Sequence, residues 1–280
     1  MSKVPTPIHL FQIAYSAQTL TNLEPGYSLI DNLANERPDW FEYWPIRRYL
    51  LTALREGTLE ENSFYGFFSP KFGLKTSLTY KDVVELVQSA VPEVDVVLFS
   101  PQPDMAAFFL NVYEQGETFD PGLINAFEQF MEQIGRPLNL SELVMNSQHI
   151  VFSNYFVARP AFWLSWLNLN EQLFEVCEGP KTTLQKLLTL PTSYPMSAQR
   201  KVFIMERTAS LLLKIEPHWR SVAANPFTMG WSMSRLRQYP HEAAISDALK
   251  LAYCENGFPE YLQAFASVRD HFMAGNPKLA

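Results

Sequence analysis

The chain has little of the residue types that most quickly narrow the class of a protein. Only two of its 280 residues are cysteine, Cys177 and Cys254, which lie far apart and match no metal-binding spacing. The five histidines form no pair at helical spacing, so histidine ligation of a metal has no support. A chain of this length buries enough surface to fold without disulfides or metals. We therefore assign no metal ligand from the sequence.

Long hydrophobic runs and an excess of basic residues are also missing. Although 47% of the residues are apolar and only 18% are charged, no apolar run approaches the roughly 20 residues of a membrane span. The formal charge of −7 and the dispersed Lys and Arg residues argue against a nucleic-acid partner. The beginning, "MSKVPTPIHLFQIAY", lacks a secretory pattern. We expect a cytoplasmic protein without a transmembrane segment, in contact with a membrane at most peripherally.

Buried strands and helices alternate in the first half of the chain. The stretches "IHLFQIAYS", "SFYGFFSP" and "DVVLFSP" predict three strands, and "YKDVVELVQSAV" predicts a helix before the third. Between residues 22 and 44, Pro, Gly, Asn and Asp predict a long irregular loop, which then leads into a helix near Pro45. This alternation of strand and helix is typical of a βαβ unit.

The rest of the chain is predicted to be mostly helical. Helices are expected at residues 105–115, 121–135, 159–179, 201–215 and 259–275, with a short one after Ser141, a strand at 149–158 and loops after Trp219. Trp163 and Trp166 share a helix face with Phe162 nearby, which is the spacing of a core stripe. We expect one α/β domain over residues 1–280, with a mixed central sheet and a helix-rich second half.

Two loops that follow predicted strands carry polar side chains suited to a ligand. Lys71 and Lys75 follow a strand that ends in Ser69, where they could hold an anion or could belong to an ordinary solvated turn. Ser100 and Asp104 follow the third strand, and ligands of open α/β sheets lie beyond the carboxyl ends of strands. Asp104 could equally cap the next helix.

Two further clusters combine carboxylates and cations. The first cluster consists of Asp31, Asn32, Asn35, Arg37, Arg47 and Arg48. Arginine guanidinium groups suit a diphosphate, and Asn or Asp side chains suit the hydroxyl groups of a sugar. Asn and Asp are also common in turns for local hydrogen-bonding reasons, which is the alternative explanation. In the second, Glu206 and Arg207 lie in a mostly apolar helix with Lys201 nearby. A buried carboxylate needs a partner, so the alternatives are an internal ion pair and a catalytic base.

In its order of blocks, the chain resembles nucleotide-sugar-dependent glycosyltransferases of the GT-A type, particularly those of bacterial polysaccharide assembly. The resemblance spans roughly residues 8 to 215, while 216–280 would be an extension of helices and loops. It is carried by "YGFFSPKF", "DVVLFSP", "SNYFVARPAFWLSWLNLNEQLFEVCE" and "KVFIMERTASLLL". It implies a GT-A-like, Rossmann-like domain that moves a sugar from a nucleotide-diphosphate donor to a glycan acceptor.

The resemblance also implies roles for individual residues. The candidates for the carboxylate near the attacking oxygen are Asp31, Asp104 and Glu206, the acceptor side would carry Asn154 and Tyr155, and the donor would contact Tyr15, Asn35, Arg37, Arg47, Lys71, Lys75 and Ser100. The family's Asp-x-Asp motif, which holds manganese or magnesium against the donor diphosphate, is missing after Asp95. Fixed cations could replace the metal. A non-catalytic protein that binds a glycan or a partner in the same pathway is the alternative.

Overall fold

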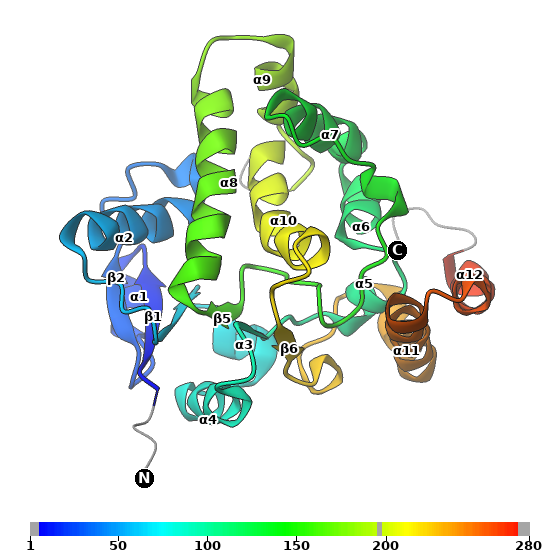
Figure 1. Ribbon diagram of the computed structural model, residues 1–280. Helices are drawn as coiled ribbons and strands as arrows, with labels where there is room; N and C mark the ends of the chain where they lie inside the picture. The colour runs from blue at the N-terminus through cyan, green and yellow to red at the C-terminus, as the bar shows by residue number, and fades with distance from the viewer. Residues whose placement is uncertain (1–5, 195–197, 274–280) are drawn as a thin grey trace.

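A mixed β-sheet forms the centre of the computed structural model, which describes residues 6–194 and 198–273 (Figure 1). The strand order is β2-β1-β3-β5-β4-β6. The strands are β1 Ile8–Ala14, β2 Ser28–Asp31, β3 Phe64–Phe68, β4 Val96–Leu98, β5 Phe156–Ala158 and β6 Ser221–Ala223. β5 is antiparallel to both of its neighbours, and the remaining pairs are parallel. The predicted α/β class with a mixed sheet is confirmed.

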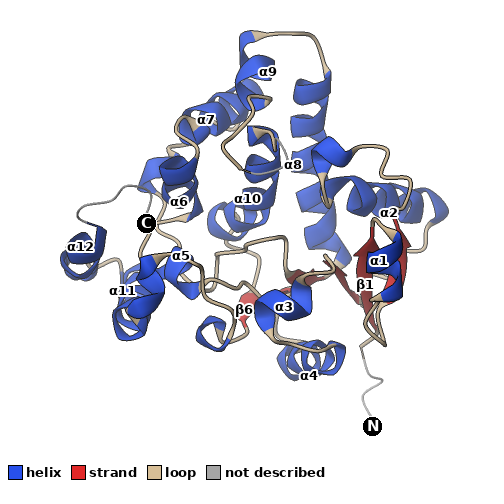
Figure 2. Cartoon of the chain, turned by 180° about the vertical axis from the view of Figure 1, so that it is seen from behind, coloured by secondary structure: helices blue, strands red, loops and turns tan. Residues whose placement is uncertain are grey.

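Helices dominate the second half of the chain, as predicted. Those of the first half are α1 Ala17–Thr21, α2 Tyr43–Glu56, α3 Phe72–Thr76, α4 Tyr80–Ala90, α5 Pro103–Ala107, α6 Val112–Phe119 and α7 Leu123–Gln133. The later ones are α8 Pro160–Glu178, α9 Thr183–Leu188, α10 Arg200–Ile215, α11 Pro240–Asn256 and α12 Pro259–Met273. Figure 2 shows α11 and α12 beside α5, on the side of the molecule far from β1. Within residues 6–194 and 198–273, none of the helices has both the length and the apolar character needed to cross a bilayer.

The two faces of the sheet pack against different helices because successive strand side chains point to opposite faces. Val96 and Leu98 of β4 belong to a large apolar core with α2, α8 and α10, whereas Val97 belongs to a second core with α3 and α4. In Figure 1, α8 and α10 lie above the sheet and α4 lies below it. Trp163 and Trp166 are fully buried in the first core, which confirms their interpretation as core residues.

A glycine permits the close packing at the centre of the sheet. Gly66 of β3 pairs with Val157 of β5. A Cβ atom at Gly66 would lie only 2.7 Å from Cγ2 of Val157. Any larger residue would therefore push β3 and β5 apart.

Several predicted boundaries are corrected by the structure. β2 lies inside the segment predicted as loop, β6 and α11 lie in the tail predicted as loops before the final helix, and the strand predicted at 149–158 is only β5. The helix predicted at 105–115 is interrupted, because Asn111 caps α6 by accepting hydrogen bonds from the backbone N–H groups of Tyr113 and Glu114. The final helix ends at Met273, and the last two residues predicted for it lie outside the described residues.

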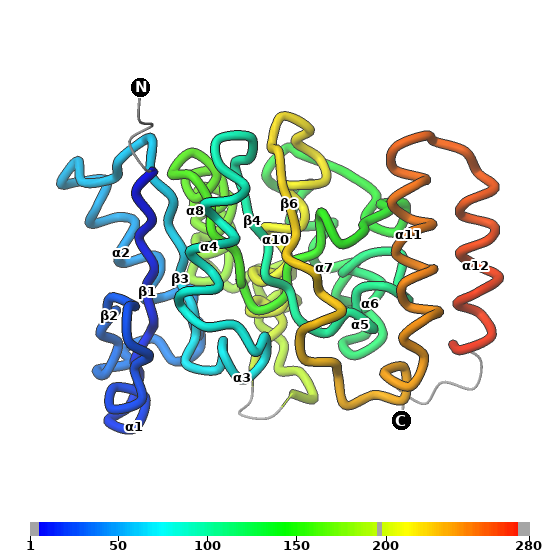
Figure 3. The backbone as a smooth tube through the Cα atoms, turned by 90° about the horizontal axis from the view of Figure 1, so that it is seen from below, coloured from blue at the N-terminus to red at the C-terminus, as the bar shows by residue number. Residues whose placement is uncertain are grey.

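One edge of the sheet gathers most of the chain segments that matter for function. The five strands that run in the same direction end there, and β5 enters the sheet from that edge. Figure 3 shows α1, α3 and the segment after β6 at this end of the molecule. Loops at the carboxyl ends of such strands are where open α/β sheets bind ligands, so this edge is where a candidate site is expected.

Candidate functional site

Two carboxylates, Glu42 and Glu206, lie near each other at the carboxyl edge. Glu42 directly precedes α2, and Glu206 lies in the middle of α10. Both are within electrostatic range of Tyr155, the residue that precedes β5. Burial, and then the negative charge of Glu42, raise the pKa of Glu206 to about 7, against the opposing effects of Arg207 and Lys75. Burial also raises the pKa of Glu42, whereas Lys75 and Lys71 lower it.

Glu206 is available to a ligand. Among residues 6–194 and 198–273, no side chain or backbone group forms a hydrogen bond or ion pair with its carboxylate, and the residue keeps partial solvent access. A carboxylate whose pKa lies near 7 can accept a proton from a hydroxyl group and release it again at neutral pH. Such a group in a polar cluster at a sheet edge has the character of a general base.

The predicted ion-pair partners of Glu206 lie elsewhere. Arg207 donates from Nε to Val112 O at 2.8 Å, from Nη1 to Phe203 O at 2.8 Å and from Nη2 to Gln115 Oε1 at 2.6 Å. Lys201 Nζ lies 2.6 Å from Asp39 Oδ2 and 3.4 Å from Glu178 Oε1. The interpretation of Glu206 as half of an internal ion pair with either cation is therefore wrong.

Two lysines on or beside α3 supply positive charge near the carboxylates. Lys75 donates from Nζ to Ser153 Oγ at 2.8 Å, and its Nζ lies 5.5 Å from the centre of the Tyr155 ring. Lys71 is exposed. Because both lysines lower the pKa of Glu42, their charges reach the same cluster. The arrangement suits an anionic group beside the carboxylates, as the sequence predicted for these lysines.

The predicted acceptor-side pair has two different environments. Tyr155 is fully buried and its hydroxyl shares a 2.6 Å hydrogen bond with Ser69 Oγ, so the structure corrects its predicted contact with an acceptor. The Tyr155 ring instead lies next to the ammonium group of Lys75. Asn154 is 2% exposed; its Nδ2 donates to Met205 Sδ at 3.4 Å, and its Oδ1 has no hydrogen-bond partner within the described part of the chain. A buried amide oxygen without a partner beside Glu206's own helix has unused capacity to accept a hydrogen bond.

Two of the predicted donor-binding arginines are already engaged in ion pairs. Arg47 forms two hydrogen bonds to Glu171, of 2.6 and 2.7 Å. Arg37 bonds to Asp39 at 3.0 Å and to Glu178 at 2.6 Å. Arg37 thus holds the loop before α2 against α8, and Arg47 holds α2 itself against α8. The structure corrects their predicted contact with a diphosphate.

The ion pair between Arg47 and Glu171 implies that Arg47→Ala destabilises the protein. The change leaves the partly buried Glu171 without its two strong hydrogen bonds, so we expect a loss of about 1–3 kcal/mol in the free energy of unfolding. Urea denaturation measures it. The control is Arg55→Ala, an exposed position in the last turn of α2, where a change within about 0.5 kcal/mol is expected. A fully stable Arg47→Ala protein that binds nucleotide weakly would restore the original interpretation.

The candidates after β4 support the chain around them. Asp104 is fully buried and accepts hydrogen bonds from the Ser232 backbone N–H at 3.1 Å, from the Ser232 hydroxyl, and from Ser234 Oγ at 3.2 Å. It lies inside α5 and does not cap it, since the capping position is Gln102. Ser100 Oγ accepts from the Phe152 N–H at 3.0 Å. The predicted catalytic role of the fully buried Asp104 is therefore corrected to a structural one, whereas the donor-binding role of Ser100 stays a prediction.

The remaining candidates lie toward the β2 side of the edge. Asp31 ends β2, three strands from β5, or roughly 14 Å at about 4.8 Å per strand. Its side chain accepts from the Leu33 N–H at 2.8 Å. Asn35 is exposed and accepts from Asn32 Nδ2 at 3.4 Å. Tyr15 is 40% exposed, and burial followed by the charge of Glu42 raises its pKa. Of these three, only Tyr15 joins the carboxylate cluster.

The residues at the carboxyl edge do not fit the manganese or magnesium ion that is expected from the resemblance to GT-A-type glycosyltransferases. Across the described part of the chain, no three His, Cys, Asp or Glu side chains converge as metal ligands. Asp95, where the missing motif would begin, lies before the amino end of β4 and interacts with Arg220 at 3.3 Å and Arg159 at 3.5 Å. Its carboxylate is therefore at the opposite edge of the sheet from Glu206.

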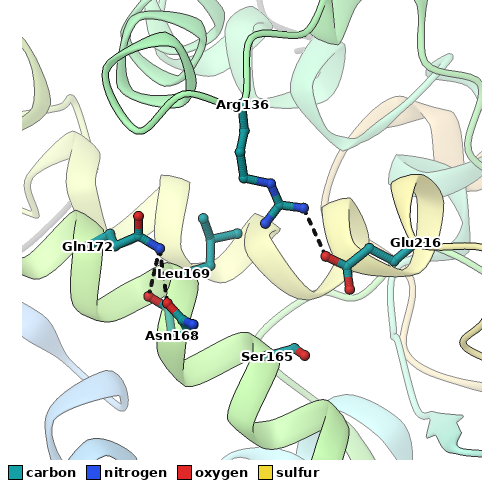
Figure 4. A pocket seen from close by; sticks show the side chains of 6 residues that line it. All are labelled: Arg136, Ser165, Asn168, Leu169, Gln172 and Glu216. Carbon is teal, nitrogen blue, oxygen red and sulfur yellow. Dashed lines mark hydrogen bonds and ion pairs between the residues drawn. The ribbon is translucent and has the colours of Figure 1, made fainter.

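A separate hollow of about 380 Å³ opens elsewhere on the surface (Figure 4). Glu216 on its rim lies ten residues after Glu206, which corresponds to about 15 Å along a helix. Its polar groups already bond to one another, with Arg136 to Glu216 at 2.9 Å and Gln172 to Asn168 at 3.0 Å. The hollow is therefore distinct from the carboxyl-edge cluster.

Three residues of the cluster were not predicted from the sequence as site residues: Glu42, Ser69 and Ser153. Glu42 lies in "PDWFEYWP", where nothing in the local pattern separates it from other acidic loop residues. Its importance comes from Lys75 and Glu206, which are distant in sequence. Comparison with known proteins adds no further assignment, because no family model, no curated protein and no solved structure significantly matches this chain.

Proposed function

We propose that the chain is a glycosyltransferase that moves a sugar from a nucleotide-diphosphate donor to a hydroxyl group of a glycan acceptor. The observation that carries the proposal is Glu206, a partly exposed carboxylate with a pKa of about 7 and no hydrogen-bond or ion-pair partner in the described part of the chain, near Lys75 and Glu42 at the carboxyl edge. The resemblance in the order of sequence blocks, and a mixed sheet in which one strand is antiparallel, support it.

The residues divide the chemistry between them. The acceptor oxygen attacks the anomeric carbon of the sugar, the bond from that carbon to the diphosphate oxygen breaks, and Glu206 takes the proton of the attacking hydroxyl. Lys75 and Lys71 stabilise the negative charge of the departing diphosphate. In this cluster the two lysines thus take the role that a divalent metal ion has in the resembling family.

A screen of nucleotide diphosphates by thermal shift tests the donor site. A ligand that binds only the folded protein stabilises it by RT ln(1 + [L]/Kd), or about 2.7 kcal/mol at one hundred times Kd. We expect at least one nucleotide diphosphate to raise the melting temperature, equally with and without manganese. No shift with any nucleotide would contradict the proposal.

The non-catalytic alternative is favoured by the missing Asp-x-Asp motif. It predicts stabilisation by a glycan, no stabilisation by nucleotide diphosphates and no release of nucleotide from a nucleotide sugar. A coupled assay of nucleotide release, run beside the thermal-shift screen, separates the two functions.

A second prediction concerns Lys75→Ala and Lys71→Ala. Hydrogen bonds to charged groups contribute about 1.5–3 kcal/mol, so each change should weaken binding of the nucleotide diphosphate by roughly 10- to 150-fold. Calorimetric titration measures the affinity. The matched control is Lys81→Ala on α4, an 82% exposed side chain paired only with Glu85. Unchanged affinity in both variants would mean that α3 carries an ordinary solvated turn.

A further inference from the structure

Two chain segments meet beside the carboxyl-edge cluster and form one surface. The first, residues 69–79, contains α3, and the second, residues 224–239, follows β6. The backbone N–H of Gly230 donates to Lys75 O at 2.9 Å. A Cβ atom at Gly230 would lie 2.5 Å from that oxygen, so only glycine permits this contact. We call the two segments together the α3 surface; Figure 3 shows both at the same end of the molecule.

The α3 surface has a charge opposite to that of the whole chain. Its two segments contain Lys71, Lys75, Arg235 and Arg237 and no acidic residue, in a protein with 29 acidic and 22 basic residues. Of the acidic residues beside it, Asp104 is enclosed by Ser232 and Ser234 and has no exposed surface. Glu24, which lies near Gly73, and Glu42 and Glu206, which lie near the lysines, are half-buried. The charged side chains of the two segments that are exposed to solvent, Lys71 and Arg237, are both basic.

The same surface carries two outward apolar side chains. Met233 is 86% exposed and Leu74 is 83% exposed, well above the next large hydrophobic residue in the described chain, Phe258 at 56%. Single exposed apolar residues are common. Here, however, the hydrogen bond from Gly230 to Lys75 O joins the backbones of the two segments; Leu74 is the neighbour of Lys75 in the chain, and Met233 comes three residues after Gly230. Trp231, which lies between Gly230 and Met233 in the sequence, is partly exposed.

We propose that the α3 surface binds the surface of an anionic phospholipid bilayer. Projecting apolar side chains enter the boundary between headgroups and acyl chains, while basic side chains contact lipid phosphates. The surface suits a bilayer better than a folded protein partner, because its apolar side chains project into solvent and would need pockets in any such partner. The inference does not rest on the proposed sugar transfer, since it uses only exposure and charge.

Co-sedimentation of the full chain with vesicles tests this proposal. We expect binding to vesicles of phosphatidylcholine with phosphatidylserine, weaker binding at high salt, and little binding to pure phosphatidylcholine. The double variant Leu74→Glu, Met233→Glu should lower the partition coefficient roughly tenfold or more, and Lys71→Glu roughly fivefold or more. The control is Leu54→Glu on α2, a 44% exposed position outside the α3 surface, which should bind like the unaltered protein.

Three outcomes would overturn the proposal: no binding of the unaltered chain to anionic vesicles, equal loss in the Leu54→Glu control, or full binding by the double variant. Sedimentation equilibrium adds a further arm. A dimer that the double variant converts to monomer, without any vesicle binding, would assign the surface to a second copy of the chain. Melting temperatures confirm that each variant is folded, and nucleotide binding measured in parallel keeps this result separate from that of the donor site.

Discussion

Replacing Glu206 with glutamine is expected to lower turnover by about 10²–10⁴, the usual contribution of general acid–base catalysis. Glutamine keeps the size of the side chain but cannot take a proton from the acceptor hydroxyl. Since the Glu206 carboxylate has no hydrogen-bond or ion-pair partner among residues 6–194 and 198–273, the change disrupts no such contact. The rate of nucleotide release from the donor sugar, measured at saturating acceptor, gives the result.

The same variant should be more stable than the unaltered protein at pH 8. The pKa of Glu206 is raised from the usual 4.5 to about 7, so between these values the folded state holds a proton that the unfolded state has lost. Stability therefore falls as the pH rises through that window. The difference corresponds to about 3 kcal/mol at most, and partial solvent access reduces it to about 1–3 kcal/mol. Glutamine removes this cost, so the gain is full above pH 7 and vanishes below about pH 4.5.

Urea denaturation at pH 8 and pH 5 measures the change in stability. Glu132→Gln, an exposed position on α7, is the matched control and should leave turnover and stability unchanged within about 0.5 kcal/mol. A Glu206→Gln protein with unaltered turnover would remove Glu206 from the catalytic site. A loss of about 3–5 kcal/mol at pH 8 would instead mean that Glu206 compensates a buried cation.

Asp104→Ala is expected to destabilise the protein by about 3–5 kcal/mol. The change leaves the N–H and hydroxyl of Ser232 and the hydroxyl of Ser234 without their shared acceptor in a buried place. The midpoint and slope of urea denaturation provide the measurement. Because the same serines shape the segment after β6, the α3 surface should become disordered before the sheet unfolds.

Asp31→Ala is the control for Asp104, because Asp31 is exposed and its carboxylate accepts a hydrogen bond from the nearby Leu33 N–H, while the backbone oxygen that Arg48 contacts is kept in the variant. A change within about 0.5 kcal/mol is expected there. If Asp104→Ala were as stable as this control and yet inactive, Asp104 would belong to the catalytic carboxylates that the sequence suggested, and its structural role would be refuted.

The parts of the fold that were predictable have a strong local signal. The stretches that form β1, β3 and β4 are rich in apolar residues, and α8 begins with Pro160 and ends before Gly179. β2 and β6 have four and three residues, close to the three of β4, but unlike β4 they lack a run of buried apolar residues that would mark them in the sequence. Such short strands exist because a neighbouring strand pairs with them, and this pairing is decided by tertiary structure.

The candidate site was predictable only where a residue's role does not depend on a distant partner. Lys71, Lys75 and Glu206 were identified from their positions after a strand or within an apolar helix. Arg47 was misinterpreted, because its partner Glu171 is 124 residues away in sequence. A guanidinium looks the same in a sequence whether it awaits a phosphate or already holds a carboxylate.

The backbone at the entrance to β5 has an energetic consequence. Ser153 and Asn154 have φ angles of 58° and 54°, in the left-handed region that glycine adopts most readily. Such conformations cost of order 1 kcal/mol each. Glycine at both positions would relieve that cost, but it would remove the hydroxyl that holds Lys75 and the amide beside Glu206. The chain thus gives up some folding free energy at this point to place two polar side chains of the candidate site, and selection for greater thermostability would work against them here.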